Sequence, residues 1–308
     1  MVEEGHELSI NEADTEKKKR RILRKAVVAS LVLIILAGML YTGFLIYNNL
    51  SLCSDVAFTN RVDKAITDSE NWIKEHRADI LKWRNAALLT MLRECDDIKA
   101  TPLFEDTVQS FLSAPQWHHS RCWVREVDPN HPIIDYELKI TFEKENIDNK
   151  WILYAIAPEL IKTAPEEMEM FAPDKWQGRQ LTHQLYALTI LRNNKGANKE
   201  LDKLIEHLCS RLSFELIFDA AIVDIYIQKV AFILRAGFPE KIRRRWVERI
   251  LDNQCSDGGW NDRWFCLQSM RRPVFDMEQP ASDQHATVQA VLALYLVRYQ
   301  YPEHFGIE

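Results

Sequence analysis

The spacing of apolar residues predicts helices along most of the chain. In residues 61–76 the apolar positions recur at helical spacing and mark one face of an amphipathic helix. Residues 83–95 are more uniformly apolar, as expected for a helix enclosed by others. Residues 104–115 return to the amphipathic pattern and end at a proline. Buried and amphipathic helices are therefore expected to alternate.

The same alternation recurs downstream. Uniformly apolar segments are 182–192, 224–237 and 285–299, and amphipathic segments are 199–212 and 239–254. The first two apolar segments close on the same Leu-Arg pair, at a spacing within the range of about 40–50 residues found in helix-pair repeats. The third requires an inserted loop before it. We therefore expect an all-α fold in which the apolar helix of each pair packs inside and the amphipathic helix outside.

One stretch departs from this pattern. Residues 122–127 and 135–145 alternate apolar and polar positions, and the turn-forming sequence DPNHP lies between them. This arrangement predicts a β-hairpin over 122–145, inserted among the helices. Such a hairpin would cap one end of the helical body or cover its mouth.

The N-terminal region predicts a membrane anchor. Residues 26–47 carry no charge and directly follow a basic cluster at 17–25. As a helix this stretch would rise about 33 Å, enough to cross a bilayer core of about 30 Å. A cleaved signal peptide is the alternative, but its apolar region spans only about 7–15 residues before a small-residue cleavage site. An uncleaved single span is therefore expected.

Charge around the span predicts its orientation. No basic cluster follows the span, so the positive-inside tendency leaves residues 1–25 in the cytoplasm and places 48–308 in a periplasm, an organelle lumen or outside the cell. The one glycosylation sequon begins at Asn49, at the membrane exit, which favours a bacterial periplasm. All six cysteines lie on the outward side, where either disulfides or buried thiols are compatible with the sequence.

The composition and charge of the chain limit the classes of partner that we expect. With 47% hydrophobic and 27% charged residues the chain is globular in composition, and a formal net charge of −6 gives no reason to expect nucleic acid as a partner. The basic stretch 243–249 is compatible with a solvated outer surface or with binding of lipid head groups. The bilayer itself is an expected partner, through residues 26–47.

The stretch QCSDGGW, residues 254–260, lies between an amphipathic segment and an apolar one. Paired glycines let the chain leave a helix with positive φ and turn sharply. Asp257 can accept hydrogen bonds from neighbouring backbone N–H groups. Trp260 can pack back over the preceding turn. The local chemistry therefore predicts a tight, fixed turn.

Together with the downstream SDQHATVQAVLALY, this stretch resembles the repeat of the α/α-toroid superfamily of terpenoid cyclases and protein prenyltransferases. Gln254, Gly258 and Trp260 also match a related turn of the triterpene cyclases, and similar turns occur in α/α-barrel polysaccharide lyases and glycosidases. Residues 246–299 carry the resemblance. It implies a partial α/α toroid with fewer helix pairs than the full enzymes.

The catalytic signatures of these families are absent. The nearest string to the cyclases' Asp-x-Asp-Asp acid is Glu94-Cys95-Asp96-Asp97, which closes an apolar helix instead of opening one. The Asp-x-Cys pair of the prenyltransferase zinc site does not occur, so we expect no metal and no cofactor. Phosphate loops, nucleophile elbows and HExxH motifs are also missing, which argues against P-loop enzymes, α/β hydrolases and zincins.

In a toroid, polar residues at the same ends of the inner helices converge on one mouth. The candidates for an acid–base set are His183, His285, Asp257 and Asp283. Candidates for lining a cavity or binding a ligand are Asp224, Tyr226, Trp260 and Asp262. Each also has a structural interpretation, as a helix N-terminal residue or a buried side chain.

Two functions are expected from this pattern. The first is a non-catalytic domain that binds a lipid, carbohydrate or protein ligand at the membrane surface. The alternative is a lyase, glycosidase or isoprenoid-acting enzyme that uses the His/Asp set in its cavity. Candidates gathered around one cavity would favour the enzyme, whereas candidates bonded into helix caps would favour the binding domain.

Overall fold

The computed structural model is all-helical in the part of the chain it describes. The described residues are 4–51, 53–83, 85–114, 121–161, 179–196, 198–220, 224–261 and 282–307. In these ranges the only extended pairing is an isolated antiparallel bridge between Trp260 and Asp283.

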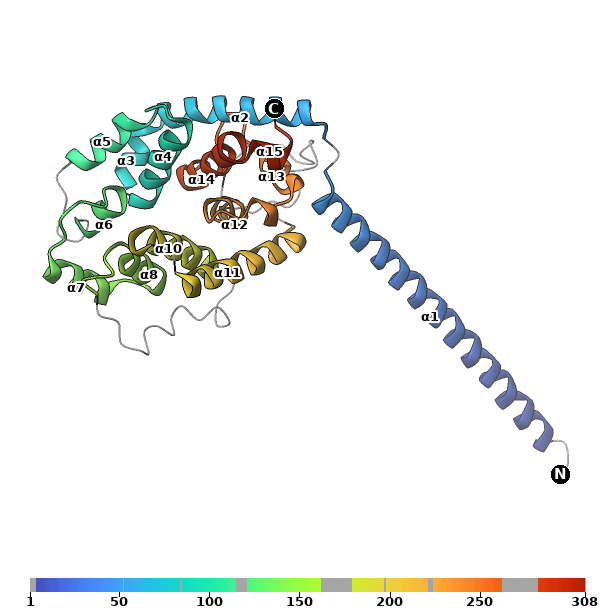
Figure 1. Cartoon of the computed structure of the whole chain (residues 1–308). Coiled ribbons are helices and arrows are strands. Elements are labelled where there is room, and N and C mark those ends of the chain that lie inside the picture. The colour runs from blue at the N-terminus through green and yellow to red at the C-terminus, as the bar shows by residue number, and fades with distance from the viewer. Residues whose placement is uncertain are drawn as a thin grey trace. The chain divides into compact units, whose positions relative to one another are not determined.

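Helices follow one another through the described residues (Figure 1). Their bounds are α1 Glu4–Asn49, α2 Asp55–Glu75, α3 Arg77–Trp83, α4 Ala86–Lys99, α5 Glu105–Ser113, α6 Arg121–Val127, α7 Asp135–Lys144, α8 Ile147–Ile156, α10 Arg179–Lys195, α11 Lys199–Phe218, α12 Asp224–Arg235, the 3₁₀-helix η3 Pro239–Lys241, α13 Arg244–Asp252, α14 Gln284–Tyr295, the π-helix η4 Leu296–Gln300 and α15 Pro302–Phe305.

The chain divides into two compact units, Met1–Leu50 and Ser51–Glu308. The first consists of α1, in which the 27 residues Leu23–Asn49 are long and apolar enough to cross a membrane. The predicted span, 26–47, falls inside this stretch. One candidate membrane-spanning helix near the N-terminus is consistent with single-pass anchoring.

In the second unit, contacts between neighbouring helices run in a closed order. Helix α4 packs against α14, α14 against α12, α12 against α10, α10 against α8, α8 against α6, and α6 against α4 (Figure 1). The uniformly apolar segments predicted from the sequence supply α4, α10, α12 and α14. Every residue of α14 from Ala286 to Tyr295 is buried, as expected of a helix enclosed by others.

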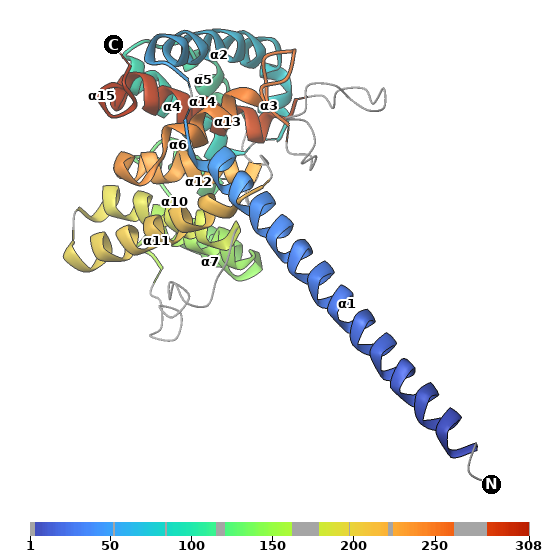
Figure 2. The same ribbon diagram turned by 90° about the vertical axis from the view of Figure 1, so that its right-hand side faces the viewer.

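The amphipathic helices pack on this inner set. Helix α11 lies along α10 and α12, and α2 packs on α14 and α13 (Figure 2). The face of α2 predicted at 61–76 is buried, including Val62, Ala65, Ile66 and Ile73. The largely buried α10 thus packs against the amphipathic α11.

The predicted β-hairpin over 122–145 is wrong, because these residues form α6 and α7. In α7 the buried residues are Leu138 and Thr141, three positions apart as on a helix face, whereas Tyr136 is 72% exposed. Asp135 in the first turn and Lys144 in the last turn complement the helix dipole. The helix also satisfies its own backbone groups, which an isolated hairpin would leave unpaired along its edges.

The QCSDGGW turn is fixed by hydrogen bonds at both ends. The Cys255 N–H donates to the Gly259 carbonyl at 2.8 Å, and the Gln254 amide donates to the carbonyl of Ala65 on α2 at 3.1 Å. The Trp260 indole N–H donates to the Ile250 carbonyl at 2.8 Å. The expected packing of this tryptophan over the preceding helix is thus confirmed.

The described cysteines are free thiols: Cys53, Cys95, Cys122, Cys209 and Cys255. Three of them are buried, which matches the interpretation of cysteine as a small apolar core residue. Cys266 lies outside the described residues.

The arginines of the basic stretch 243–249 mostly bind within the protein. Arg244 donates to the Cys53 carbonyl at 3.0 Å and the Ser54 carbonyl at 2.7 Å, and also pairs with Asp55. Arg249 is buried and donates to two carbonyls just after α11, those of Asp219 at 2.8 Å and Ala220 at 3.0 Å. Helix α13 therefore holds both the segment that follows the membrane span and the end of α11.

Gly258→Ala should destabilise the protein more than Gly237→Ala. Both glycines have positive φ, +95° and +93°, so alanine is strained at each by about 1–2 kcal/mol. At Gly258 the added Cβ would also lie 2.6 Å from the Asp68 carbonyl oxygen, whereas at Gly237 it meets nothing within 4 Å. Urea denaturation should show the additional loss, about 1–3 kcal/mol, at Gly258 alone. Equal losses would contradict the close approach of this turn to α2.

Candidate functional site

The first turns of α10, α12 and α14 meet at one end of the inner set. The Thr182 hydroxyl on α10 donates to Gln228 Oε1 on α12 at 2.8 Å. Asp224, the first residue of α12, lies 3.3 Å from His285 on α14. These contacts define a start cluster, which consists of Thr182, Asp224, Gln228, His285 and Gln289.

Polar contacts run through the start cluster from a carboxylate to a buried amide. His285 Nδ1 lies 3.3 Å from Asp224 Oδ2, and His285 Nε2 lies 3.0 Å from the Gln289 side-chain amide. Gln228 also donates to Asp224 Oδ2 at 3.4 Å. The carboxylate favours the imidazole tautomer that has its proton on Nδ1, which leaves Nε2 as an acceptor.

Exposure differs sharply within the start cluster. The side chain of His285 is 36% exposed and that of Asp224 26%, whereas Gln289 and Gln228 are each 1% exposed. Gln289 Oε1 is buried without a hydrogen-bond partner among the described residues. Buried carboxamide oxygens are nearly always paired, because an unpaired one loses its hydration without compensation. A ligand donor that reaches past His285 would supply the missing bond.

Two of the predicted acid–base residues stabilise the local fold. Asp257 accepts hydrogen bonds from the Gly259 N–H at 3.2 Å, the Ser282 hydroxyl at 2.5 Å and the Trp72 indole N–H at 3.3 Å. Asp283 is the N-cap of α14 and accepts from the backbone of the third residue beyond it at 2.9 Å. Both therefore have the capping role that acidic residues prefer at turns and helix starts.

The remaining predicted residues are distributed around the same end. Tyr226 is buried, donates to the Trp246 carbonyl at 3.2 Å and stacks under Arg249, so it faces α13. Trp260 is also buried against α13 through its bond to Ile250. His183 is half-buried in the first turns of α10. Asp262 lies outside the described residues.

A second polar group, the interior network, was not predicted. It consists of Glu94 on α4, Glu126 on α6, Tyr186 and Thr189 on α10, and Arg235 on α12. Arg235 binds both carboxylate oxygens of Glu94 through its Nε, at 3.0 and 2.8 Å, and also pairs with it through Nη2. Its guanidinium lies 4.6 Å from the centre of the Tyr186 ring, and the Tyr186 hydroxyl donates to Glu126 at 2.6 Å.

Burial dominates the electrostatics of the interior network. Glu126 is 6% exposed, and this burial raises its pKa to about 7, against the opposing effects of the Tyr186 hydrogen bond and the Arg235 charge. Burial, followed by the nearby Glu126 charge, also raises the pKa of Tyr186. Near neutral pH the network therefore carries one carboxylate–guanidinium pair and one carboxyl group close to its titration midpoint.

Part of this network had a signal in the sequence. Glu94 opens the acidic string at 94–97, and Arg235 closes an apolar segment, so both are charges at the ends of buried helices. Glu126 has no such signal, because the alternating pattern around it predicts a strand. Asp96, from the same acidic string, accepts from the backbone N–H groups of Leu103 and Phe104 and fixes the loop after α4.

Within the described residues no group of His, Cys, Asp and Glu side chains has the arrangement of a metal site. No protein-family model matches the chain, and the comparisons with curated proteins and with solved structures also find no match. The chemistry of the two polar groups is therefore the basis for any functional assignment.

Asp257→Asn should destabilise the protein by about 1–2 kcal/mol at neutral pH, because the hydrogen bonds that Asp257 accepts favour its charged form. These bonds, led by that from Ser282 and opposed by burial, lower the pKa of Asp257. A lowered pKa contributes stability above the unfolded-state value and loses it as pH falls through the folded-state value. The difference in the free energy of unfolding between wild type and variant should therefore become smaller as the pH falls. Urea denaturation across pH measures it, and a difference that widens in acid would contradict this role.

Glu126→Gln should remove a pH dependence of stability. Its pKa of about 7 lies above the ordinary value of 4.5, so the unfolded chain ionises first as pH rises. Wild type should therefore lose up to about 3 kcal/mol between pH 4.5 and 7 through this group, with no further loss at higher pH. Glutamine stays neutral and still accepts the Tyr186 bond, so the variant should be the more stable protein at pH 8.

The control for this experiment is Glu143→Gln, a substitution on the exposed surface of α7. It should leave the pH profile of the free energy of unfolding close to that of wild type. If the pH profile of Glu126→Gln follows that of wild type as closely as the control does, Glu126 does not have a raised pKa in the folded protein. The charge assigned to the interior network would then be wrong.

Proposed function

We propose that residues 51–308 form a partial α/α toroid that binds a ligand without converting it. The closed order of contacts among α4, α14, α12, α10, α8 and α6 supports the toroid, with α2, α7, α11 and α13 outside it. The span in α1 holds this domain at the outer face of a membrane, and its N-terminus is cytoplasmic. The basic cluster at 17–25 supports that orientation.

The observation that carries this proposal is the half-satisfied Gln289 carboxamide beside a partly exposed imidazole. A buried amide oxygen without a partner gains about 1–3 kcal/mol when a donor reaches it. The Asp224 carboxylate adds acceptor oxygens at the same place. A ligand rich in hydroxyl groups, a carbohydrate or a lipid head group, provides donors for all of them.

We favour ligand binding over catalysis because two of the four predicted acid–base residues already have a structural role. Asp257 and Asp283 are engaged with backbone groups of the turn and of α14. At Asp257 burial is outweighed by the hydrogen bonds of the turn, which lower the pKa of this carboxyl and make it a poor proton donor near neutral pH. The set of four candidates is therefore reduced to His285 and the half-buried His183.

The second candidate function is an enzyme, favoured by the Asp224–His285 pair. A carboxylate beside Nδ1 orients the imidazole ring, and an oriented imidazole is a frequent general base. In this case a lyase, glycosidase or isoprenoid-acting enzyme would abstract or deliver a proton at His285 Nε2. Asp224 would position the ring.

The test is ligand-dependent stabilisation of the full chain in detergent micelles. Polyprenyl phosphates and neutral and acidic oligosaccharides are added, and the melting temperature is measured. A ligand at a hundred times its dissociation constant should add about 2.7 kcal/mol to the free energy of unfolding. We expect one class to give this shift, His285→Ala to abolish it, and His304→Ala, on the exposed surface of α15, to retain it.

Two outcomes would contradict the assignment. A shift that survives in His285→Ala would mean that the ligand binds elsewhere. The absence of a shift with every class would exclude these ligands and direct the search to a protein partner by crosslinking at the membrane. Product formation by wild type, lost in His285→Ala, would favour the enzyme.

A further inference from the structure

One face of α11 exposes two aromatic side chains to solvent. Phe214 and Phe218 are 62% and 42% exposed, lie one helical turn apart, and pack edge to face with ring centres 5.2 Å apart. Exposed aromatic residues side by side on a soluble surface are unfavourable in water, and such patches mark interaction sites. The pair therefore indicates a partner that accepts apolar rings.

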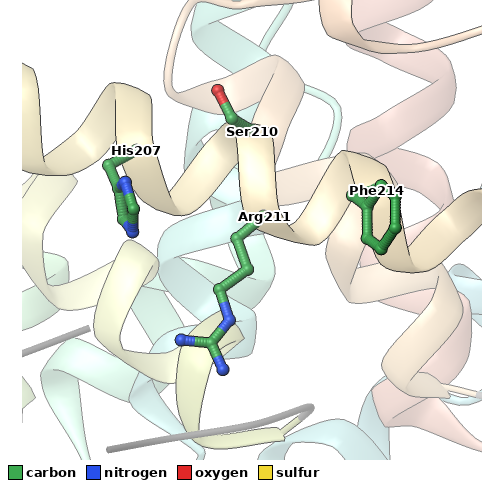
Figure 3. A pocket seen from close by; sticks show the side chains of 4 residues that line it. All are labelled: His207, Ser210, Arg211 and Phe214. Carbon is green, nitrogen blue, oxygen red and sulfur yellow. The ribbon is translucent and has the colours of Figure 1, made fainter. Parts of the chain in front are cut away.

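Polar and cationic side chains continue this face. His207, Ser210, Arg211 and Phe214 line a surface depression of about 490 Å³ (Figure 3). The Lys241 ammonium donates to the Ser210 hydroxyl at 3.0 Å and adds a second cation beside Arg211. Hydroxyl and cationic groups next to aromatic rings fit a phosphate group attached to apolar chains.

Three carboxylates of α11 lie near cations of neighbouring helices. Asp202 lies 4.0 Å from Arg192 on α10, Glu215 lies 2.8 Å from Lys229 on α12, and Glu206 lies 3.9 Å from Lys241. Helical spacing places Lys203, His207, Arg211, Phe214 and Phe218 on a common face, with the cations preceding the aromatic pair. This set is named the α11 face.

The α11 face ends close to the segment that joins this unit to the membrane span. Arg249 on α13 binds the carbonyls of Asp219 and Ala220, directly after Phe218. Arg244 on the same helix binds the carbonyls of Cys53 and Ser54. Five residues of helix rise about 7.5 Å, so the aromatic pair and the residues that leave the membrane are attached to one short rigid element.

We propose that the α11 face docks on the phospholipid head groups of the membrane that holds the anchor. Phe214 and Phe218 enter the boundary between head groups and acyl chains, while Arg211, Lys203 and His207 contact phosphate oxygens. The anchor keeps lipid at high effective concentration, so a weak contact is sufficient. The inference rests on the membrane anchoring in the proposed function and is independent of the ligand at the start cluster.

The test uses the full chain in phospholipid nanodiscs. The photo-crosslinker p-benzoyl-phenylalanine replaces Phe214 in one sample and Tyr136, 72% exposed on α7, in a control sample. After irradiation, mass spectrometry measures the fraction of chain that carries a lipid adduct. We expect several-fold more lipid adduct at position 214 than at position 136, and a several-fold decrease at 214 when Phe218→Ser is added.

The results that would overturn the proposal are specific. Equal lipid adducts at positions 214 and 136 would reflect only the nearness of any exposed residue to the bilayer. Crosslinks from position 214 to a second chain would assign the α11 face to self-association. Thermal melting in the nanodisc verifies that each substituted chain is folded. If lipid adducts form at position 214 while oligosaccharides and polyprenyl phosphates no longer shift the melting temperature, the lipid contact is independent of ligand binding at the start cluster.

Discussion

The ion pair between Arg235 and Glu94 is the interaction on which the packing of residues 51–308 depends. It joins α12 to α4, which are separated by α14 in the order of contacts, so it spans the inner set and does not merely link neighbours. Hydrophobic packing is non-directional, whereas a guanidinium that binds both oxygens of a carboxylate fixes the geometry of the two helices. Removal of either partner alone would leave a charge unpaired in a largely buried site, at a cost of about 3–5 kcal/mol.

This constraint extends to the neighbouring helices through shared partners. Thr189 and Tyr186 on α10 both contact the guanidinium of Arg235. Glu126 on α6 accepts a hydrogen bond from Tyr186 and so joins α6 to the same group. The short α6 also buries Cys122, Val124 and Val127, and its backbone is bonded to α4. Its Val127 carbonyl accepts from Arg93 on α4, and its Glu126 carbonyl accepts from Thr90 at 3.1 Å. Polar contacts thus add direction to the apolar packing of α6.

The sequence was most informative where local pattern and burial agree. The long apolar runs became α4, α10, α12 and α14 because a helix enclosed by others has no polar side to display. The GlyGly turn was predictable because the positive φ at Gly258 is a local requirement, whereas its close approach to Asp68 on α2 was not predictable. The hairpin failed for the opposite reason. In residues 122–145 the alternating pattern does not match burial, since Tyr136 is exposed and Thr141 is buried, and the segment packs as helices against α4 and α8.

The candidate site was only partly predictable, since its parts depend on which helices meet. Asp224 and His285 are distant in sequence. They were predicted to lie close together because the starts of apolar helices were expected to converge, and they do lie close together. The same expectation included Asp257 and Asp283, which the backbone uses for capping. Local demand for hydrogen-bond acceptors at turns and helix starts is the stronger effect there. A sequence cannot separate an acid that caps from one that reacts.

What distinguishes the two polar groups is whether their hydrogen-bonding capacity is filled. In the interior network Arg235 has partners on two helices and Glu126 is bonded by Tyr186, so a ligand would have to replace bonds that already exist. In the start cluster the Gln289 oxygen is unpaired and the adjoining imidazole is open to solvent. A ligand that adds hydrogen-bond donors would complete the bonding of the start cluster but would have to break bonds in the interior network. The arginines of α13 that suggested a lipid contact are likewise bound within the protein, Arg244 and Arg249 to backbone carbonyls and Arg245 to the carboxylates of Glu248 and Asp252.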